Sequence, residues 1–394
     1  MFLSFVRLVR QYSRFLLVRV VLYALMALVA VASAILFGDY IPDSVTGFVG
    51  AEAMDAILTT LASSMLAVTT FSLSIMAAAM QGASGTLTPR SRLVLRQDGE
   101  TQSVLSTFVG AFVFSLVTII LRATPLVGEK ERFVLFCASV LVVCLVLVAI
   151  IRWIRRLETL GATDDTVLKL QARAEAAMKA YSASPSLGAH VWTRAECDDM
   201  RGKPYIAAKR DGYVQQIMEE LLQEVAKEND TFVYVAVSTG DYVVEGQPLV
   251  YADGCENLET TDQAKLREAV FLQQARGFDQ DPQLGVTVLT EVASRALSPA
   301  VNDVQTAVDI VHRLSSVFLK AEHGAHELRY SHVWIIPQTL EAMFAASFDV
   351  IARDGADAGE LMAAIVESLG RIEAMGQGEL PKLARATAAR LSLG

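Results

Sequence analysis

The sequence has only four cysteines and lacks the common catalytic motifs. Cys197 and Cys255 are isolated, and no cysteine spacing suits a metal site or a disulfide framework. The G-x-S-x-G, Walker, Rossmann and H-E-x-x-H patterns do not occur. We therefore expect a protein that is not an enzyme and that holds no cofactor and no metal.

Charge is also scarce, since charged residues make up 20% of the chain and hydrophobic residues 53%. The mean hydropathy is +0.39. Four segments are long enough and free enough of charge to cross a bilayer, namely about 20–37, 56–80, 103–121 and 133–151. Nothing after Arg156 qualifies. The expected fold class is a membrane all-α part with four transmembrane helices in residues 1–151, followed by a cytoplasmic α+β domain.

The basic residues beside these segments predict the orientation of the chain. Ten lie on the side of the N-terminus, the second loop and the segment after the fourth span: Arg7, Arg10, Arg14, Arg19, Arg90, Arg92, Arg96, Arg152, Arg155 and Arg156. The opposite side has Arg122, Lys130 and Arg132. Basic residues collect on the cytoplasmic side, so we expect a multi-pass protein with both the N- and the C-terminus in the cytoplasm. Ala32-Ser33-Ala34 resembles a signal-peptide cleavage site, but the full-length apolar run before it favours a membrane span.

The region after residue 151 is acidic, with 24 basic and 35 acidic side chains. Nucleic acid is not an expected partner for such a surface. We divide it into a helical connector at 152–186, a β-rich module at 187–256 and a mainly helical part at 257–394. In the β-rich module Thr231–Val237 alternates β-branched and aromatic residues as a strand does, and with the turns and strands of Gly240–Val250 it resembles the small β-sandwich of lipoyl and biotinyl domains. In the last part we expect helices at 262–276, 285–297, 338–353, 357–375 and 380–392 and a short strand at Val333–Ile336.

Several separated motifs resemble one bacterial membrane-protein family, known as domain of unknown function 2254. The motifs are Arg276-Gly277-Phe278-Asp279-Gln280-Asp281-Pro282, Ala296–Asp303, Thr88-Pro89-Arg90, Asp211-Gly212-Tyr213-Val214 and Gly240-Asp241-Tyr242-Val243. Ala300 and Val304 depart from the family pattern, where Gly and Pro are expected. The resemblance implies four spans and a soluble domain, and with the orientation it places the protein in the bacterial cytoplasmic (inner) membrane. It supplies no activity.

The second span is unusual because residues 56–80 carry eight serines and threonines. Small and polar residues form one stripe along it, at Ser63, Ala67, Thr70, Ser74, Ala77 and Gln81. Such a stripe permits close helix packing, and repeated around a symmetry axis it could line a pore. Both interpretations stay open. The stripe has no charged residue, which argues against a proton relay or a charge-coupled carrier.

Two further groups are candidate sites. Arg90, Arg92 and Arg96 could contact lipid headgroups or the inner mouth of a pore, or could reflect topology alone. The second group is a candidate ligand or subunit-contact site, and its alternative is a structural turn with Asn302 as the N-cap of a helix. It contains Asp279, Asp281, Arg295, Ser298, Asn302 and Asp303.

Two functions follow as hypotheses. The first is a homo-oligomeric ion channel or pore whose second spans surround the axis. Its partners would be membrane lipids, other copies of the chain and ions. The second is a membrane-anchored sensor or scaffold, in which the stripe only packs helices and the soluble domain binds a partner or a small ligand.

Overall fold

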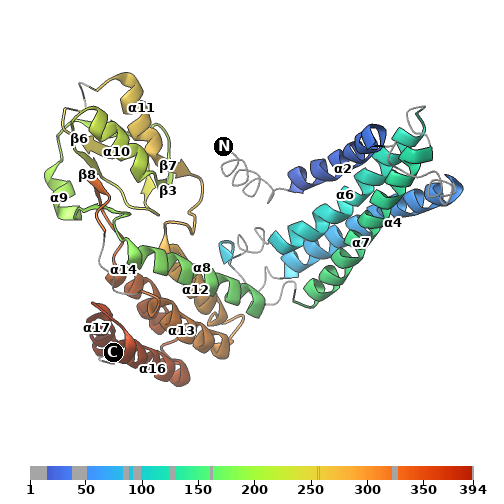
Figure 1. The fold of residues 1–394 in the computed structure, drawn as a ribbon. Coiled ribbons are helices and arrows are strands. Elements are labelled where there is room, and N and C mark those ends of the chain that lie inside the picture. The colour runs from blue at the N-terminus through green and yellow to red at the C-terminus, as the bar shows by residue number, and fades with distance from the viewer. Residues whose placement is uncertain are drawn as a thin grey trace. The chain divides into compact units, whose positions relative to one another are not determined.

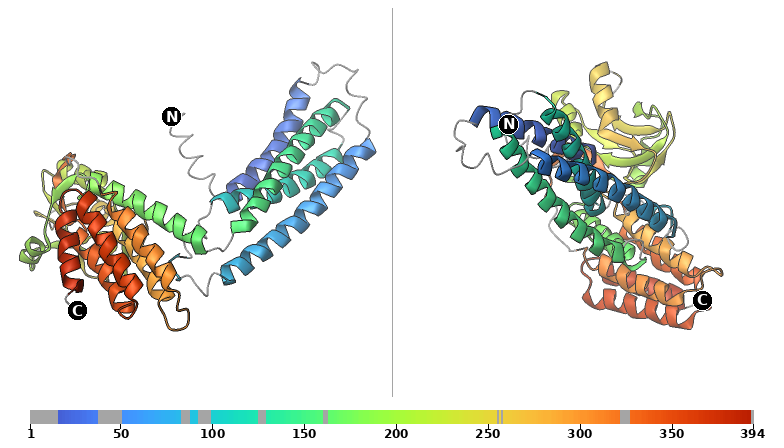
Figure 2. Two further views of the ribbon diagram at one scale, coloured as in Figure 1. Left: turned by 90° about the horizontal axis from the view of Figure 1, so that it is seen from below. Right: turned by 90° about the vertical axis from the view of Figure 1, so that its right-hand side faces the viewer.

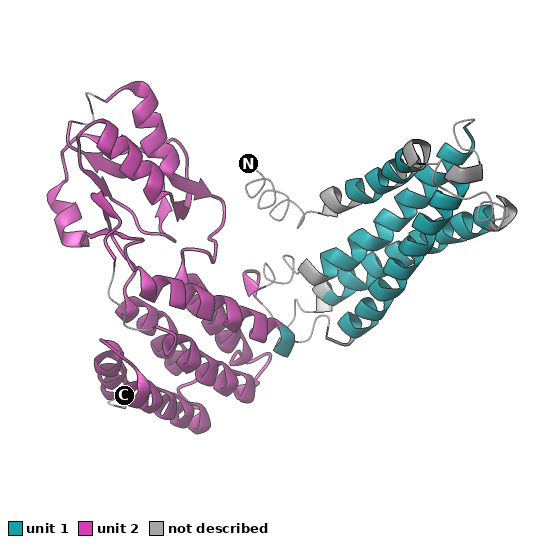
Figure 3. Cartoon of the chain, in the orientation of Figure 1, with its two compact units in different colours: residues 1–85, 93–165 teal, residues 86–92, 166–394 magenta. Residues whose placement is uncertain are grey.

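The structure is a computed structural model that describes residues 16–37, 51–82, 88–91, 99–124, 129–159, 163–254, 256, 258–321 and 327–392. It divides the chain into two compact units (Figure 3). Unit 1 contains residues 1–85 and 93–165, and unit 2 contains residues 86–92 and 166–394. The short segment 86–92 therefore belongs to the second unit, although it lies within the membrane-type part of the sequence.

Unit 1 is a bundle of long helices (Figures 1 and 2). Its described helices are α2 (Leu16–Phe37), α4 (Ala51–Gly82), α6 (Gly99–Arg122) and α7 (Glu129–Thr159). Helix α6 packs against each of the other three. The bundle core contains Leu58, Phe108, Phe114 and Leu135, each fully buried. Because lipid offers no hydrogen-bond partners, helices that satisfy their own backbone suit these apolar segments.

Three of these helices are long and apolar enough to cross a membrane, over Met54–Ala79, Thr101–Arg122 and Arg132–Leu157. They contain the predicted spans 56–80, 103–121 and 133–151. In the described residues of α2, the apolar segment Val21–Ala30 is shorter. Helices of the length and apolar composition needed for a span are thus confirmed for three of the four predicted segments.

Unit 2 is an α+β region with two sheets. The five-stranded sheet has the order β1-β8-β4-β6-β2 and the three-stranded sheet has the order β5-β3-β7. The strands are β1 (Ala189–Val191), β2 (Tyr205–Ala207), β3 (Gly212–Ile217), β4 (Val233–Val235), β5 (Tyr242–Val243), β6 (Pro248–Ala252), β7 (Val270–Gln273) and β8 (Tyr330–Ile335). Strand β8 pairs in parallel with β1 and β4, and the remaining pairs are antiparallel.

Both faces of the five-stranded sheet are apolar. Val233, Val235, Val250 and Ile335 join a buried core that includes residues of α10 (Glu219–Glu228) and α11 (Thr260–Ala269). Aromatic residues follow one another in register across the strands on the other face, at His190, Trp334, Tyr234, Tyr251 and Tyr205. Trp192, just before the short helix α9 (Arg194–Asp199), packs against two of these rings.

Two strands come from the part of the chain expected to be mainly helical. The predicted helix 262–276 is wrong in its second half, because Val270–Gln273 forms β7 against β3. Buried and exposed side chains alternate along Val270, Phe271 and Leu272, as a half-covered strand requires. Strand β8 also lies after residue 256, so the sheets extend beyond the expected β-rich module.

The rest of unit 2 is helical, with α8 (Thr163–Ala183), α12 (Pro282–Ala296), α13 (Val304–Phe318), α14 (Leu340–Phe344), the π-helix η3 (Ala345–Asp349), α15 (Val350–Asp354), α16 (Gly359–Met375) and α17 (Leu380–Ser392). Phe318, Phe344 and Phe348 form its aromatic core, with ring centroids 4.3 to 5.8 Å apart. The predicted helices at 285–297, 338–353, 357–375 and 380–392 correspond to these elements.

Candidate functional site

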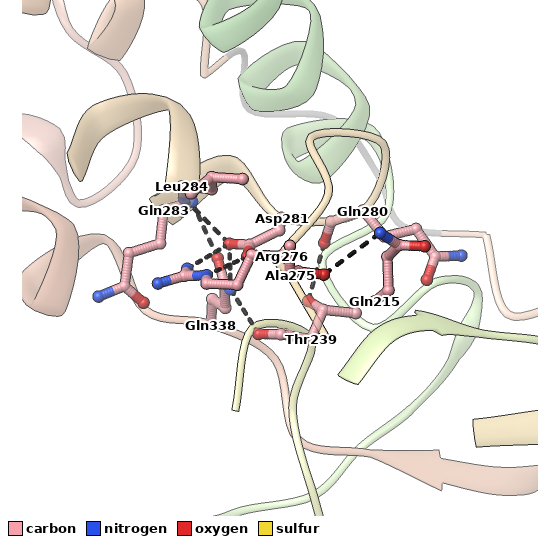
Figure 4. Close-up of polar contacts among 9 residues, drawn as sticks. All are labelled: Gln215, Thr239, Ala275, Arg276, Gln280, Asp281, Gln283, Leu284 and Gln338. Atoms are coloured by element: carbon pink, nitrogen blue, oxygen red, sulfur yellow. Dashed lines mark hydrogen bonds and ion pairs between the residues drawn. The ribbon is translucent and has the colours of Figure 1, made fainter. Parts of the chain in front are cut away.

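A buried carboxylate organises the junction between the sheets and the helices of unit 2 (Figure 4). The side chain of Asp281 is 2% exposed and that of Arg276 is 19% exposed. Arg276 Nε donates to Asp281 Oδ2 at 2.7 Å and Arg276 Nη2 donates to Oδ1 at 2.7 Å. Asp281 is also the N-cap of α12, since its Oδ1 accepts from the backbone N–H of Leu284 at 3.0 Å.

Gln338, which follows β8, completes this network. Its Nε2 donates to Asp281 Oδ1 at 2.8 Å and to the carbonyl of Thr239 at 2.7 Å. Its Oε1 accepts from the backbone N–H of Gln283 at 3.1 Å. Gly240 is required here, because it has φ +85° and an added Cβ would lie 2.7 Å from both Arg276 Nη2 and Asp281 Oδ2. These hydrogen bonds join α12, the segment at Thr239 and the segment after β8, and we call this network the brace.

A cavity of about 170 Å³ lies against this brace. Thr239, Gln280 and Gln338 form part of its wall. Gln280 is held by Ile217, whose N–H donates to Gln280 Oε1 at 2.8 Å and whose carbonyl accepts from Nε2 at 3.1 Å. Apolar residues of α8, β3 and the end of β8 line the rest, including Ala177, Ile217, Ile335 and Ile336.

Titratable groups also line the cavity, and their pKa values respond to burial. Burial raises the pKa of Tyr181 to about 12, with the charge of Glu379 as a smaller cause. The Tyr181 hydroxyl donates to the carbonyl of Gln338 at 2.7 Å. Burial also raises the pKa of Glu219, at the start of α10, above its ordinary value. A half-buried carboxylate with a raised pKa in a cavity is typical of a ligand-binding position.

The structure does not bring the six residues of the predicted second group together. Asp279 and Asp281 lie just before the first residue of α12, Arg295 lies in its last turn, and the other three lie beyond its end. The helix has 15 residues and therefore spans about 22 Å. Asp279 lines the cavity, whereas Asp281 is buried and ion-paired with Arg276. The two carboxylates therefore serve different roles and do not form a metal-ion pair of ligands.

The prediction of Asn302 as a helix N-cap is wrong by one residue. Asp303 caps α13, because it accepts from the backbone N–H of Thr306 at 3.0 Å and from its hydroxyl at 2.5 Å. These hydrogen bonds lower the pKa of Asp303. Asn302 adopts φ +50° in the preceding turn, and the Ser298 hydroxyl donates to the carbonyl of Arg295 at 2.7 Å. The turn and cap are satisfied locally.

All six residues of the predicted stripe on α4 are exposed on unit 1: Ser63, Ala67, Thr70, Ser74, Ala77 and Gln81. The opposite side of α4 is buried in the bundle through Met54, Leu58, Leu61 and Met65. On α6, by contrast, Ala111, Ser115 and Thr118 are fully buried. The polar face of α4 thus points away from the helices of its own chain.

The hydroxyls of this face are bonded within α4. Ser63 Oγ donates to the carbonyl of Thr59 at 2.9 Å, and Thr70 Oγ1 donates to that of Leu66 at 3.0 Å. Ser74 Oγ donates to the carbonyl of Thr70 at 3.0 Å. Each hydroxyl proton is therefore used inside the helix, and the oxygen lone pairs remain to accept bonds from outside.

The described residues of the basic loop after α4, 88–91, belong to unit 2. Arg90 forms an ion pair with Glu291 of α12. Thr88 and Ser91 are buried, and the Ser91 hydroxyl donates to the Thr88 carbonyl at 2.9 Å. The other two basic residues predicted here, Arg92 and Arg96, lie outside the described residues. In this structure the partner of Arg90 is thus a carboxylate of the protein.

Comparison with known protein families shows to which family the chain belongs. Residues 13–371 match the family described as "Predicted membrane protein (DUF2254)". The chain belongs to this family. It is a membrane protein, as the apolar helices of unit 1 indicate. Uncharacterized proteins of Mycobacterium bovis and Mycobacterium tuberculosis are 31% identical to it over 118 residues, which cover 28% of this chain and 22% of each relative. No solved structure matches the chain.

Sequence reasoning placed Asp281 and Asp279 among the candidates but missed the groups around them. Arg276 lies in the quoted motif, only five residues from Asp281, so its basic charge was a usable signal. Gln338 and Glu219 carry no local signal, since they lie 57 residues after and 62 residues before Asp281. Only the fold of unit 2 brings these segments to one cavity.

Proposed function

We propose that this DUF2254 protein is a homo-oligomeric ion channel in which the exposed polar face of α4 lines a path for cations. In this proposal α2 is a fourth span, and both termini lie in the cytoplasm of a bacterial cell. The ten basic residues on one side of the spans support that orientation.

The observation that carries the proposal is the exposure of the polar face on α4. One side of this 32-residue helix is buried in its own bundle, and Ser63, Thr70 and Ser74 are exposed on the other, beside the exposed Leu66, Phe71 and Leu73. Lipid offers these hydroxyls no hydrogen-bond partner, whereas a second copy of α4 or a column of water does. Copies arranged about an axis would bring these faces together.

The hydroxyl geometry favours cations over anions. Since Ser63, Thr70 and Ser74 donate their protons inside α4, they offer oxygen lone pairs to a permeating ion or its water. The region after residue 151 has 35 acidic and 24 basic side chains, which raises the local concentration of cations. The face itself carries no charged residue, so we expect passive conduction rather than coupled transport.

The test places a single cysteine on the face, as Thr70→Cys, in full-length protein whose four native cysteines are replaced by alanine. We expect oxidative cross-links between copies in membranes, and a block of cation flux in liposomes by a charged thiol reagent. The matched control is Leu147→Cys on α7, an exposed apolar position at which neither effect is expected. Wild-type protein that shows no flux in liposomes would refute the channel.

A membrane-anchored scaffold is the second candidate, and the same hydroxyls give it a specific argument. Because each hydroxyl already has a partner within α4, the face does not need water and can serve as a close helix seam. Cross-links at Thr70→Cys without flux and without reagent sensitivity would favour this function.

A further inference from the structure

The cavity of unit 2 has two carboxylates and a single basic group among its described lining residues. Glu219 and Asp279 both line it, and neither forms an ion pair with any residue that the structure describes. The cavity also has one guanidinium, on Arg329, but this group pairs with Glu327 at 3.2 Å. The uncompensated charge in the cavity is therefore negative.

The walls limit the chemistry of an occupant. Ile217, Ile335, Ile336 and Leu187 supply apolar surface on several sides. A volume of about 170 Å³ corresponds to about six water molecules in the liquid. A bare metal ion would leave this apolar surface unused, and hard cations prefer a shell of oxygen ligands. An anion would meet two carboxylates.

We propose that this cavity binds a small organic cation, a primary amine with a compact apolar body. The ammonium group lies between the carboxylates of Glu219 and Asp279, and the apolar body packs on the isoleucines. Three N–H donors of an ammonium can bond both carboxylates and one hydroxyl, such as that of Thr239. Burial disfavours the charged form of Glu219, and a bound cation offsets that cost.

The site is formed before the ligand arrives. Gln338, Gln280 and Thr239 line the cavity and are each fixed by hydrogen bonds to other parts of unit 2. A wall held in this way loses little conformational entropy on binding. The proposal concerns unit 2 alone and holds whether or not α4 conducts ions.

The test measures binding of isoamylamine to the full-length protein in detergent by isothermal titration calorimetry. Isoamyl alcohol has the same body without the charge, and 4-methylpentanoate has the opposite charge. We expect saturable binding of the amine alone. Glu219→Gln should weaken it at least tenfold, and Asp279→Asn should weaken it less because Asp279 is exposed. The matched control is Glu224→Gln, which changes an exposed carboxylate on the same helix.

A second variant separates loss of the site from loss of the fold. Ala180 lines the cavity from α8 and is exposed, so Ala180→Phe should fill the space without disturbing the core. We expect it to abolish amine binding while the unfolding midpoint stays unchanged. Equal binding of the alcohol, undiminished binding in Glu219→Gln and Ala180→Phe, or displacement of the amine by millimolar Mg²⁺ would each overturn the proposal.

Discussion

Replacing Asp281 by alanine should destabilise unit 2 strongly. The carboxylate is buried, bonds Arg276 through both oxygens, and accepts from Leu284 N–H and Gln338 Nε2. Removal of one partner from a buried ion pair costs about 3–5 kcal/mol, because the other charge is left unpaired. The lost helix cap costs about 1 kcal/mol more. Since Arg276 keeps 19% of its side chain exposed and can regain some water, we expect a total of about 3–4 kcal/mol.

The assay is urea unfolding of the full-length protein in detergent, followed by tryptophan fluorescence. A Trp153→Phe background removes the tryptophan of unit 1, so that the signal comes from Trp192 and Trp334 in unit 2. The matched control is Asp279→Ala, two residues earlier and exposed, which should change the free energy of unfolding by less than about 0.5 kcal/mol.

A double variant tests the reason for the cost. If the unpaired guanidinium is the main cause, Asp281→Ala combined with Arg276→Leu should be more stable than Asp281→Ala alone. A cost below about 1 kcal/mol for Asp281→Ala, or a double variant no better than the single one, would refute the reasoning about this network.

Three further predictions use the same unfolding assay or thermal unfolding of the full chain. Gly240→Ala should cost about 1–3 kcal/mol more than Gly246→Ala, because both have positive φ but only the first Cβ meets neighbouring atoms; equal costs would contradict this. Glu219→Gln should raise stability at pH 7, since burial raises the pKa of Glu219. The advantage should shrink as the pH falls and vanish below about 4.5, the ordinary pKa of the group, where both states of the wild type bind the proton; a constant advantage would exclude this cause. Ser72 Oγ is buried without a hydrogen-bond partner among the described residues, so Ser72→Ala should raise the thermal midpoint slightly, and a clear drop would indicate a partner.

The membrane part was the most predictable from the sequence. Length and lack of charge are local properties, and they predicted the apolar segments of α4, α6 and α7 within a few residues. The exposed side of α4 was not predictable, because the spacing of Ser63, Thr70 and Ser74 defines a face without saying what the face contacts. Packing of the opposite face against α6 decides that it points outward.

Unit 2 was predictable where an element's pattern is local. The amphipathic segments at 357–375 and 380–392 form α16 and α17 nearly as predicted. Strand β7 was mistaken for a helix, because a short apolar run of four residues fits either period and its pairing with β3 is distant. The position of β8 between β1 and β4 depends on partners more than 90 residues away.

The sequence indicated which residues belong to a candidate site, but it did not indicate how they are arranged in space. Asp279 and Asp281 are two residues apart in one loop, yet only Asp281 is buried. Asp281 is the N-cap of α12 and is ion-paired with Arg276. Arg295 and Asp303 are close in sequence to the same motif but are separated from it by the length of α12. The number of residues between two positions does not by itself give their distance in space, because a helix between them holds them apart.

The part of the loop after α4 that the structure describes packs within unit 2. Residues 86–92 connect α4 to α6 in sequence but pack as part of unit 2, where Arg90 pairs with Glu291. Glu291 lies on α12, the helix that begins at Asp281 and whose first residue, Pro282, lines the cavity. Helix α12 therefore carries both Pro282, which lines the cavity, and Glu291, which pairs with Arg90, nine positions further along the helix.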